Sequence, residues 1–165
     1  MKIPSWLRHL PGIGPERRLA LYPPFRALSV QVLALENDWR RVRIRLPLTA
    51  FNRNPGGGMF GGAVAMLADP IPALACNRVF PGYRLWTRAM TLDFRREGRS
   101  DLELRFDLDA AREAAIRDEL ARRGRATPSF EFGFYDTRDR LCVQVRNTVA
   151  IRPADYRPDD RIRRR

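Results

Sequence analysis

The clearest pattern in the chain is the alternation of apolar and polar positions over residues 39–46. Three apolar side chains alternate there with three arginines. A period of two predicts a half-buried β-strand whose arginines face water. Residues 27–35 precede it, and they are apolar and β-branched enough for a strand. An Asn37-Asp38 turn signal separates the two segments, which predicts a β-hairpin.

The second half of the chain shows the same pattern in four further segments. They predict strands at residues 83–95, 101–108, 129–135 and 141–151. The first two are expected to pair across a turn at 96–99, and the last two across a turn at 136–139. Between these pairs, residues 110–123 separate charged from apolar side chains at helical spacing, which predicts a surface helix that ends at Gly124.

Residues 60–77 differ from all of these segments because they are apolar on every side and rich in small side chains. A helix that is apolar all round is a buried helix. Asp69 is followed by Pro70, so the helix is predicted to break or kink at that point. The whole order of elements packs most economically as an antiparallel sheet wrapped around this helix, which is an α+β fold.

Composition divides the 165-residue chain into three regions. Residues 1–24 are rich in proline and glycine, and they predict an N-terminal arm with a short helix at 16–21. Residues 25–152 form one predicted domain, and 153–165 a basic tail. No apolar stretch has the length of a transmembrane helix. The N-terminus lacks the pattern of a signal peptide, so we expect a cytoplasmic protein.

Arginine dominates the charge of the chain. There are 31 Lys plus Arg against 19 Asp plus Glu, a formal net charge of +12, and Lys2 is the single lysine. Arginine forms paired hydrogen bonds to carboxylates and phosphates, which favours anionic partners such as a nucleotide-bearing cofactor, nucleic acid or anionic lipid. The arginines are scattered over the predicted strands, and a cluster occurs only at residues 161–165. We therefore expect no specific nucleic-acid site.

The standard metal and nucleophile patterns are missing from the sequence. Cys76 and Cys142 both lie in apolar segments, and they are predicted to be buried thiols of a protein in a reducing compartment. With the single histidine, His9, they are too few for a four-ligand Cys/His zinc site, and we expect no bound metal. Nothing around His9 supports a Ser–His–Asp or Cys–His catalytic site.

The start of the buried helix is the first candidate for chemistry. Gly61 and Gly62 follow the flexible run of three glycines at 56–58. A helix N-terminus has unpaired N–H groups and a partial positive charge. Glycines there allow a substrate to approach, which predicts an oxyanion hole for a substrate carbonyl. The alternative is that the glycines only allow the sheet to pack closely on the helix.

Asp69 is the second candidate. A carboxylate in an apolar segment is unfavourable unless it is paired or used. It has the chemistry to attack a substrate carbonyl as a nucleophile or to act as base for a water molecule. The alternative is structural, because Asp69 before Pro70 has the pattern of an N-cap that begins a second helical segment. Two carboxylate oxygens can serve both purposes, so the sequence leaves both open.

Asn54 and a group of three arginines are weaker candidates. Asn54 has an amide that can hold a substrate carbonyl, brace the glycine loop, or belong to an ordinary Asn-Pro turn. Arg95, Arg96 and Arg99 gather at a predicted strand end. They can bind the phosphates of a carrier such as coenzyme A, or form a solvated turn.

Residues 54–69 resemble the hotdog-fold thioesterases of the phenylacetate-pathway type. In that family an Asn is followed six positions later by His-Gly-Gly, and an Asp stands seven residues after the second glycine. Asn54, Gly62 and Asp69 match that spacing. Residues 91–98 are similar to the family's strand segment, so the resemblance covers roughly 25–152. It implies a hotdog fold, in which the sheet wraps around a central helix, and a homodimer or dimer of dimers.

The resemblance also implies a site between subunits that acts on an acyl-CoA or acyl-carrier thioester, with coenzyme A as part of the substrate and no separate cofactor. Gly61 and Gly62 then polarise the thioester carbonyl, Asp69 of the facing subunit attacks it or activates water, and Asn54 orients substrate or water. Phe60 stands where the family has histidine. With Met59, it is expected to line the substrate site.

Phe60 and the Asp69-Pro70 pair together are similar to an uncharacterised bacterial branch of this superfamily, a family of unknown function. The predicted function is acyl-CoA hydrolysis. The alternative is a hotdog protein that binds acyl-CoA or an acyl chain without catalysis.

Overall fold

A computed structural model describes residues 14–157 of the chain, so His9 and the arginines at 161–165 lie outside the described residues. Its centre is one six-stranded antiparallel sheet of order β1-β2-β4-β5-β6-β3. The strands are β1 (Gln31–Glu36), β2 (Arg41–Leu46), β3 (Tyr83–Phe94), β4 (Leu102–Asp107), β5 (Ser129–Tyr135) and β6 (Leu141–Pro153).

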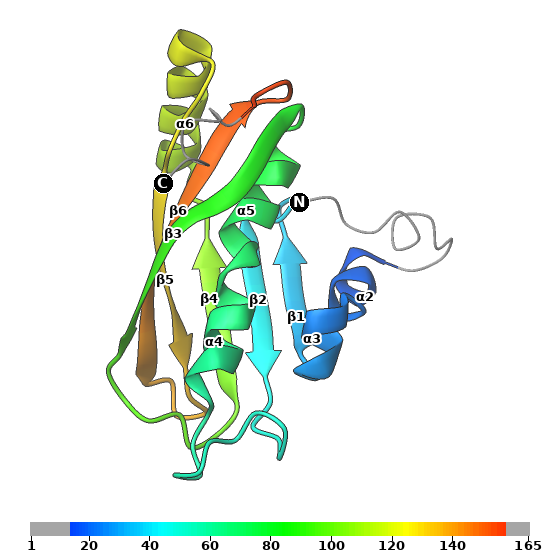
Figure 1. Cartoon of the computed structure of the whole chain (residues 1–165), viewed down its shortest axis with the longest axis vertical. Helices are drawn as coiled ribbons and strands as arrows, with labels where there is room; N and C mark the ends of the chain where they lie inside the picture. The colour runs from blue at the N-terminus through cyan, green and yellow to red at the C-terminus, as the bar shows by residue number, and fades with distance from the viewer. Residues whose placement is uncertain (1–13, 158–165) are drawn as a thin grey trace, which may run out of the picture.

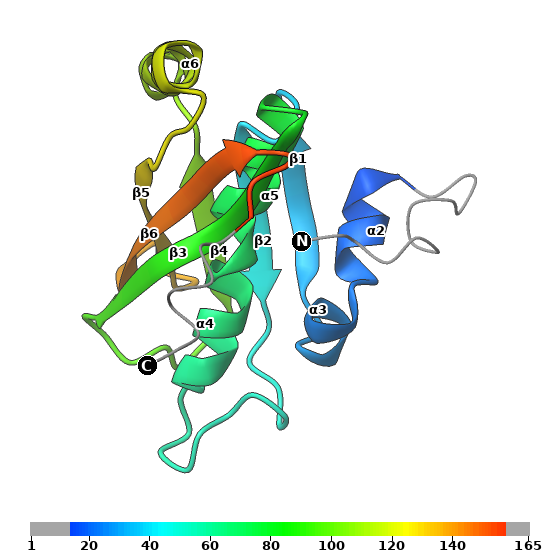
Figure 2. The same ribbon diagram turned by 45° about the horizontal axis from the view of Figure 1, so that its top comes forward.

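Two consecutive helices, α4 (Gly61–Ala68) and α5 (Pro70–Val79), lie across one face of this sheet. The sheet curls around them, and the edge strand β3 contacts α5 (Figures 1 and 2). The predicted break at Asp69 is confirmed because α4 ends before it and α5 begins after it.

The apolar residues that alternate along β2 and β4 form part of the core beneath these helices. Both strands place every second residue against α4 and α5, and these residues are buried, whereas the positions between them reach the surface. The antiparallel register sets the core residues opposite one another as Val42↔Phe106, Ile44↔Leu104 and Leu46↔Leu102. The prediction of arginines on the wet face of residues 39–46 is confirmed.

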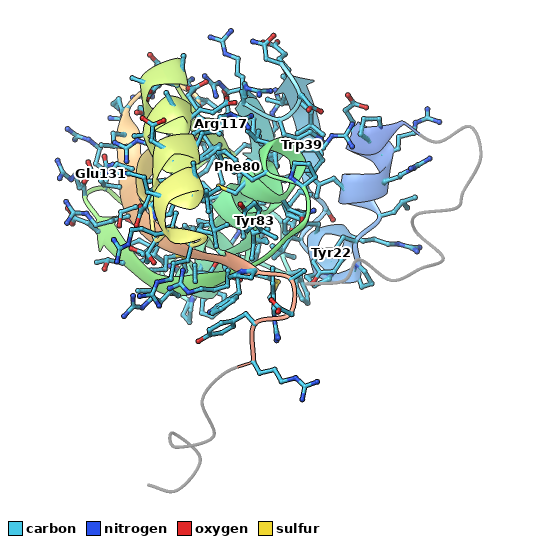
Figure 3. The ribbon with its side chains drawn as sticks, turned by 90° about the horizontal axis from the view of Figure 1, so that it is seen from above. Tyr22, Trp39, Phe80, Tyr83, Arg117 and Glu131 are labelled. Carbon is cyan, nitrogen blue, oxygen red and sulfur yellow. The ribbon has the colours of Figure 1, made fainter. Side chains whose placement is uncertain are left out.

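The helix α6 (Ala110–Arg123) connects β4 to β5 and has the predicted ends. The Asp109 carboxylate accepts a hydrogen bond from the Arg112 N–H at 2.7 Å, and Gly124 ends the helix with a left-handed φ of 63°. Arg117 lies over the Phe80 ring at 5.2 Å, so α6 packs at the end of α5 (Figure 3). Among residues 14–157, no helix combines the length and apolar composition that crossing a bilayer requires.

The predicted pairing of residues 83–95 with 101–108 is wrong. The strand β3 pairs with β6 along its whole length, from Tyr83↔Pro153 to Phe94↔Val143, whereas β4 lies between β2 and β5. The connecting segment does not reverse tightly. The N–H groups of Arg95 and Arg96 donate to the Cys142 carbonyl, and the segment then crosses to the start of α4. Alternation identifies a strand and its buried face, but not its neighbour.

The predicted strand at 27–35 begins too early. The segment before β1 forms two short helices, α2 (Pro15–Ala20) and α3 (Pro23–Ala27), and β1 starts only at residue 31. The two prolines at 23 and 24 occupy the first helical positions, where the missing N–H is harmless and the fixed φ is favourable. Ser29, with a φ of 56°, then turns the chain into β1, and α2 lies alongside that strand (Figure 2).

Candidate active site

The loop before α4 is organised by Asn52, which is buried. Its Oδ1 accepts a hydrogen bond from the Thr49 N–H at 2.8 Å, and its Nδ2 donates to the Pro47 carbonyl at 2.7 Å. Its own carbonyl accepts from the Phe60 N–H at 2.7 Å, directly before the helix. Asn52 therefore sets where α4 begins. The sequence analysis missed it because an asparagine in a polar loop carries no signal of burial.

Asn54 braces the glycine loop, which is one of the three alternatives left open by the sequence. Its Oδ1 accepts from the Gly58 N–H at 3.1 Å, and its Nδ2 donates to the Met59 carbonyl at 3.3 Å. The Met59 N–H donates to the Gly98 carbonyl at 2.8 Å, so the same loop is also held by the segment after β3. The Met59 side chain is buried in the core.

Two phenyl rings lie on the two glycines at the start of α4. A Cβ atom built on Gly62 would be 2.3 Å from the Phe60 ring, and one built on Gly61 would be 3.1 Å from the Phe94 ring. Phe60 and Phe94 are 56% and 55% exposed. Glycine therefore allows both rings to lie close to the helix start. Phe94 belongs to β3, so the contact at Gly61 is the close packing of sheet and helix that the sequence left open as an alternative. The rings form an apolar wall beside the helix start.

The amides of Gly61 and Gly62 belong to the first turn of α4, which has no intrahelical acceptors. Phe60 occupies the N-cap position and has no side chain that can cap these groups. The helix start therefore presents uncapped N–H groups and the positive end of the helix dipole. This arrangement has the donor chemistry of the predicted oxyanion hole.

Asp69 does not act as an N-cap, which was one of the two alternatives left open by the sequence. Its backbone is helical, with φ −52° and ψ −55°, and its side chain makes no capping hydrogen bond. An N-cap residue normally has extended backbone, which lets its side chain turn back to the helix N–H groups. The carboxylate is exposed in the single chain, so the expectation of a carboxylate surrounded by apolar groups is also wrong here.

The main-chain carbonyl of Asp69 is anchored to the sheet by two side chains that the sequence analysis missed. Thr87 on β3 donates its hydroxyl to this oxygen at 2.8 Å, and Asn147 on β6 donates its Nδ2 at 3.1 Å. Asn147 could have been identified from the sequence, because it is a polar residue at a position where the alternation along β6 predicts an apolar one.

One face of α4 is uncovered. Gly62, Met66 and Asp69 follow helical spacing along that face, and Met66 and Asp69 are exposed, whereas the opposite face is buried against the sheet. The prediction of a helix buried on every side is therefore wrong for the single chain. Gly61 and Asp69 are eight residues apart, or about 12 Å along the helix axis. Within one chain they cannot both contact the same reacting group.

The three arginines after β3 are exposed, and they are not equivalent. Arg95 pairs with Asp93 at 2.9 Å, and Arg99 pairs with Glu97 at 2.7 Å. Arg96 forms no ion pair with any residue in the range 14–157. This segment adjoins the helix start because the Gly98 carbonyl accepts the Met59 N–H.

Both cysteines are free and buried, which confirms the prediction of buried thiols. Burial raises the pKa of the Cys76 thiol to about 12. A thiol with this pKa is protonated at neutral pH, and therefore it does not compete with Asp69 as a nucleophile.

The curled antiparallel sheet around one central helix is a hotdog fold, and the resemblance seen in residues 54–69 is confirmed. The chain belongs to the family described as Domain of unknown function (DUF4442), whose model matches residues 17–151. A search of curated proteins gives no match.

Solved structures with this fold include several proteins described as thioesterases. The chain is 28% identical to PA5026 of Pseudomonas aeruginosa, a protein of unknown function described as a probable thioesterase; the match covers 92% of this chain and 97% of that one, with a TM-score of 0.70. The PaaI protein from the phenylacetic acid degradation operon of Escherichia coli is 20% identical, with coverages of 76% and 81% and a TM-score of 0.58. Thioesterase HI1161 of Haemophilus influenzae is 16% identical, with coverages of 86% and 91% and a TM-score of 0.64.

Proposed function

We propose that two copies of this chain form a thioester hydrolase that acts on acyl-CoA. The observation that carries the proposal is the uncovered face of α4. It presents uncapped glycine amides at one end and an exposed carboxylate at the other, beside the free edge of the sheet. The thioesterases among the similar structures support the class of reaction.

The amides of Gly61 and Gly62 stabilise the charge that develops on the thioester oxygen as the carbonyl carbon becomes tetrahedral. Asp69 takes a proton from a water molecule, whose oxygen attacks that carbon, or attacks the carbon itself and is then released by water. The C–S bond breaks, the carboxylic acid leaves, and coenzyme A leaves as a thiol after it gains a proton.

The separation of about 12 Å along α4 requires that the amides and the carboxylate come from different copies. The free edge of β3 supplies a surface for that second copy, because an unpaired strand edge pairs readily with another strand. We therefore propose a homodimer in which Asp69 of one copy faces Gly61 and Gly62 of the other. A dimer of dimers is an extension of the same arrangement.

The nucleotide part of coenzyme A is anionic and requires a cationic partner outside the reacting centre. Arg96 is the best placed of the three arginines in its segment, because Arg95 and Arg99 already pair with neighbouring carboxylates. We place the protein in the cytoplasm, which is consistent with two free thiols in a reducing compartment.

The first test is hydrolysis of a panel of acyl-CoA thioesters by the purified protein and by Asp69→Asn. The substitution keeps the size of the side chain and removes the base. We expect kcat/KM to fall at least about tenfold, or about 1.4 kcal/mol of transition-state stabilisation. Equal rates for the two proteins would remove Asp69 from the mechanism.

The second test mixes two inactive variants, Asp69→Asn and Gly62→Val. If each site takes its amides from one copy and its carboxylate from the other, a mixed dimer contains one site with both native partners. Random mixing then restores about a quarter of the sites. No recovery after verified exchange of subunits would show that the two groups do not meet across an interface.

One observation favours a second function, which is binding of acyl-CoA or an acyl chain without turnover. The Phe60 ring lies on Gly62, where the thioester oxygen must approach. A binding protein would show saturable acyl-CoA binding and no hydrolysis across the whole panel. Phe60→Ala distinguishes the two functions, because a binder with a blocked amide gains turnover when the ring is removed.

A further inference from the structure

Asn147 is a polar residue on the buried face of β6. Its side chain is 0% exposed, as are those of Val145 and Val149, its neighbours on the same face of the strand. An amide buried between a sheet and a helix is unfavourable unless hydrogen bonds compensate for the lost water. The bonds that Asn147 makes therefore indicate why an amide is present at this position.

The Nδ2 of Asn147 donates to the main-chain carbonyl of Asp69 at 3.1 Å. Because the acceptor is a carbonyl, the amide nitrogen must face it, and Oδ1 must point elsewhere. The next residue in the chain is Pro70, and Pro72 follows, so the junction of α4 and α5 lacks two helical N–H donors. Helices bend at such positions unless other groups hold them. The sheet holds this junction at the residue that we propose as the base.

The other end of the amide, Oδ1, is buried, and no group of residues 14–157 donates a hydrogen bond to it. A buried acceptor without a donor lowers the stability of the fold. The Asp69 carbonyl would keep its bond from the Thr87 hydroxyl if Asn147 were apolar. An apolar residue would therefore serve folding at least as well, and a residue that lowers stability in this way is typical of functional sites.

We propose that Asn147 is a positioning residue for Asp69, and this inference rests on the proposed function. Through the main-chain carbonyl it fixes the junction of the two helices, and thereby the direction in which the Asp69 carboxylate points. Asn147 does not contact the reacting atoms. Its effect on the reaction passes through the backbone of Asp69.

Asn147→Val tests this role, because valine suits a buried strand position and removes both ends of the amide. We expect kcat for acyl-CoA hydrolysis to fall about tenfold with little change in KM, and the melting temperature to stay the same or rise. Val145→Ala is the matched control, since it makes a cavity two residues away on the same face. It should lower the melting temperature and leave kcat per folded site unchanged. A lower melting temperature with native kcat in Asn147→Val would overturn the proposal.

Asn147→Asp is the conservative variant and adds a pH readout. A protonated carboxyl at this position can donate to the Asp69 carbonyl as the amide does, whereas an ionised one repels it. The ratio of variant to native kcat should therefore be highest at acidic pH and fall as the pH rises. A ratio independent of pH, in protein that is folded throughout the range, would contradict a hydrogen bond that directs Asp69.

A third measurement separates this inference from the proposed function. Three-bond NMR couplings report the χ1 rotamer of Asp69 without any substrate. We expect one rotamer in the native protein and averaging over several in Asn147→Val. If the native protein hydrolyses no acyl-CoA, the proposed function is contradicted and the NMR result on Asp69 still stands. If the Asp69 couplings are identical in both proteins, the positioning role is contradicted and the proposed function still stands.

Discussion

The two edge strands of the sheet, β1 and β3, differ in how far other parts of the chain cover them. Along β1 lie the helices α2 and α3, and Phe25 and Leu28 are buried there (Figure 1). The other edge, β3, is twice as long, and within residues 14–157 it pairs with β6 alone. Beside it stand Phe60, Phe94 and Met66, which are large apolar side chains exposed to water.

The difference supports the proposal that a second copy binds at the β3 edge. An exposed strand edge with apolar side chains beside it is a surface prepared for pairing. In the proposed mechanism the site lies at this edge and needs a second copy, because Gly61 and Asp69 are about 12 Å apart along the axis of α4. A partner that covers β3 would complete the site as well as the sheet. The β1 edge has no such requirement.

The largest expected effect is a loss of stability when a buried ring is removed at the β1 edge. Phe25→Ala removes a ring that is 0% exposed, and we expect the free energy of unfolding to fall by about 3–5 kcal/mol. Phe94→Ala removes an equal ring at the open edge, where we expect a loss under about 1 kcal/mol in dilute protein. Denaturant unfolding measures both. Similar losses would mean that the two edges are equally buried in solution.

A smaller effect concerns association through the open edge. Met66 on α4 is 45% exposed, and Leu33 on β1 is 44% exposed, so the two form a matched pair. We expect Met66→Lys to raise the Kd for self-association at least tenfold, about 1.4 kcal/mol, because it places a charge on the surface that a partner would bury. Leu33→Lys should leave the Kd unchanged in sedimentation experiments. The reverse order would move the interface to β1.

The smallest effect tests the charges that tie α6 to the start of β2. The Arg40 guanidinium donates to Glu113, and together with Arg117 it lowers the pKa of that carboxyl to about 2. In the unfolded chain the carboxyl titrates near 4.5. The ion pair therefore adds stability above that value, and this contribution is lost as the pH falls towards 2.

Glu113→Gln removes this dependence. We expect the substitution to lower the free energy of unfolding by under about 1 kcal/mol at pH 7, since Arg40 is one-third exposed. The difference between native protein and variant should vanish near pH 2. Denaturant unfolding at a series of pH values measures it, and parallel curves for the two proteins would show that the ion pair does not form.

Features with a local cause could be predicted from the sequence. The ends of α6 follow from Asp109 and Gly124, because a capping carboxylate and a left-handed glycine act within one helical turn. The two hairpins, β1 with β2 and β5 with β6, follow from alternation interrupted by short turns. The start of α4 at the two glycines and the break before Pro70 could also be predicted, because both have local causes in the sequence.

Features that depend on distant segments could not be predicted. The partner of β3 depends on the path of the chain over the helix start, and the exposed state of Asp69 depends on which side of α4 the sheet covers. Asn52 is an ordinary asparagine of a polar loop, and Asn147 interrupts the apolar pattern of β6 without indicating its hydrogen-bond partner. The roles of both depend on burial and on contacts that the tertiary structure makes. The sequence left open whether Asp69 caps the second helical segment, and the structure shows no cap because the Asp69 backbone stays helical across the break.

The sequence by itself therefore determined which strand residues face the core, where α6 begins and ends, and where the helical segment after Phe60 breaks. These properties arise from periodicity and from contacts within one or two turns. Only the tertiary structure decided the order of the strands, the free edge at β3, and the anchoring of Asp69 by Thr87 and Asn147. They depend on packing between segments far apart in the chain, which no local pattern encodes.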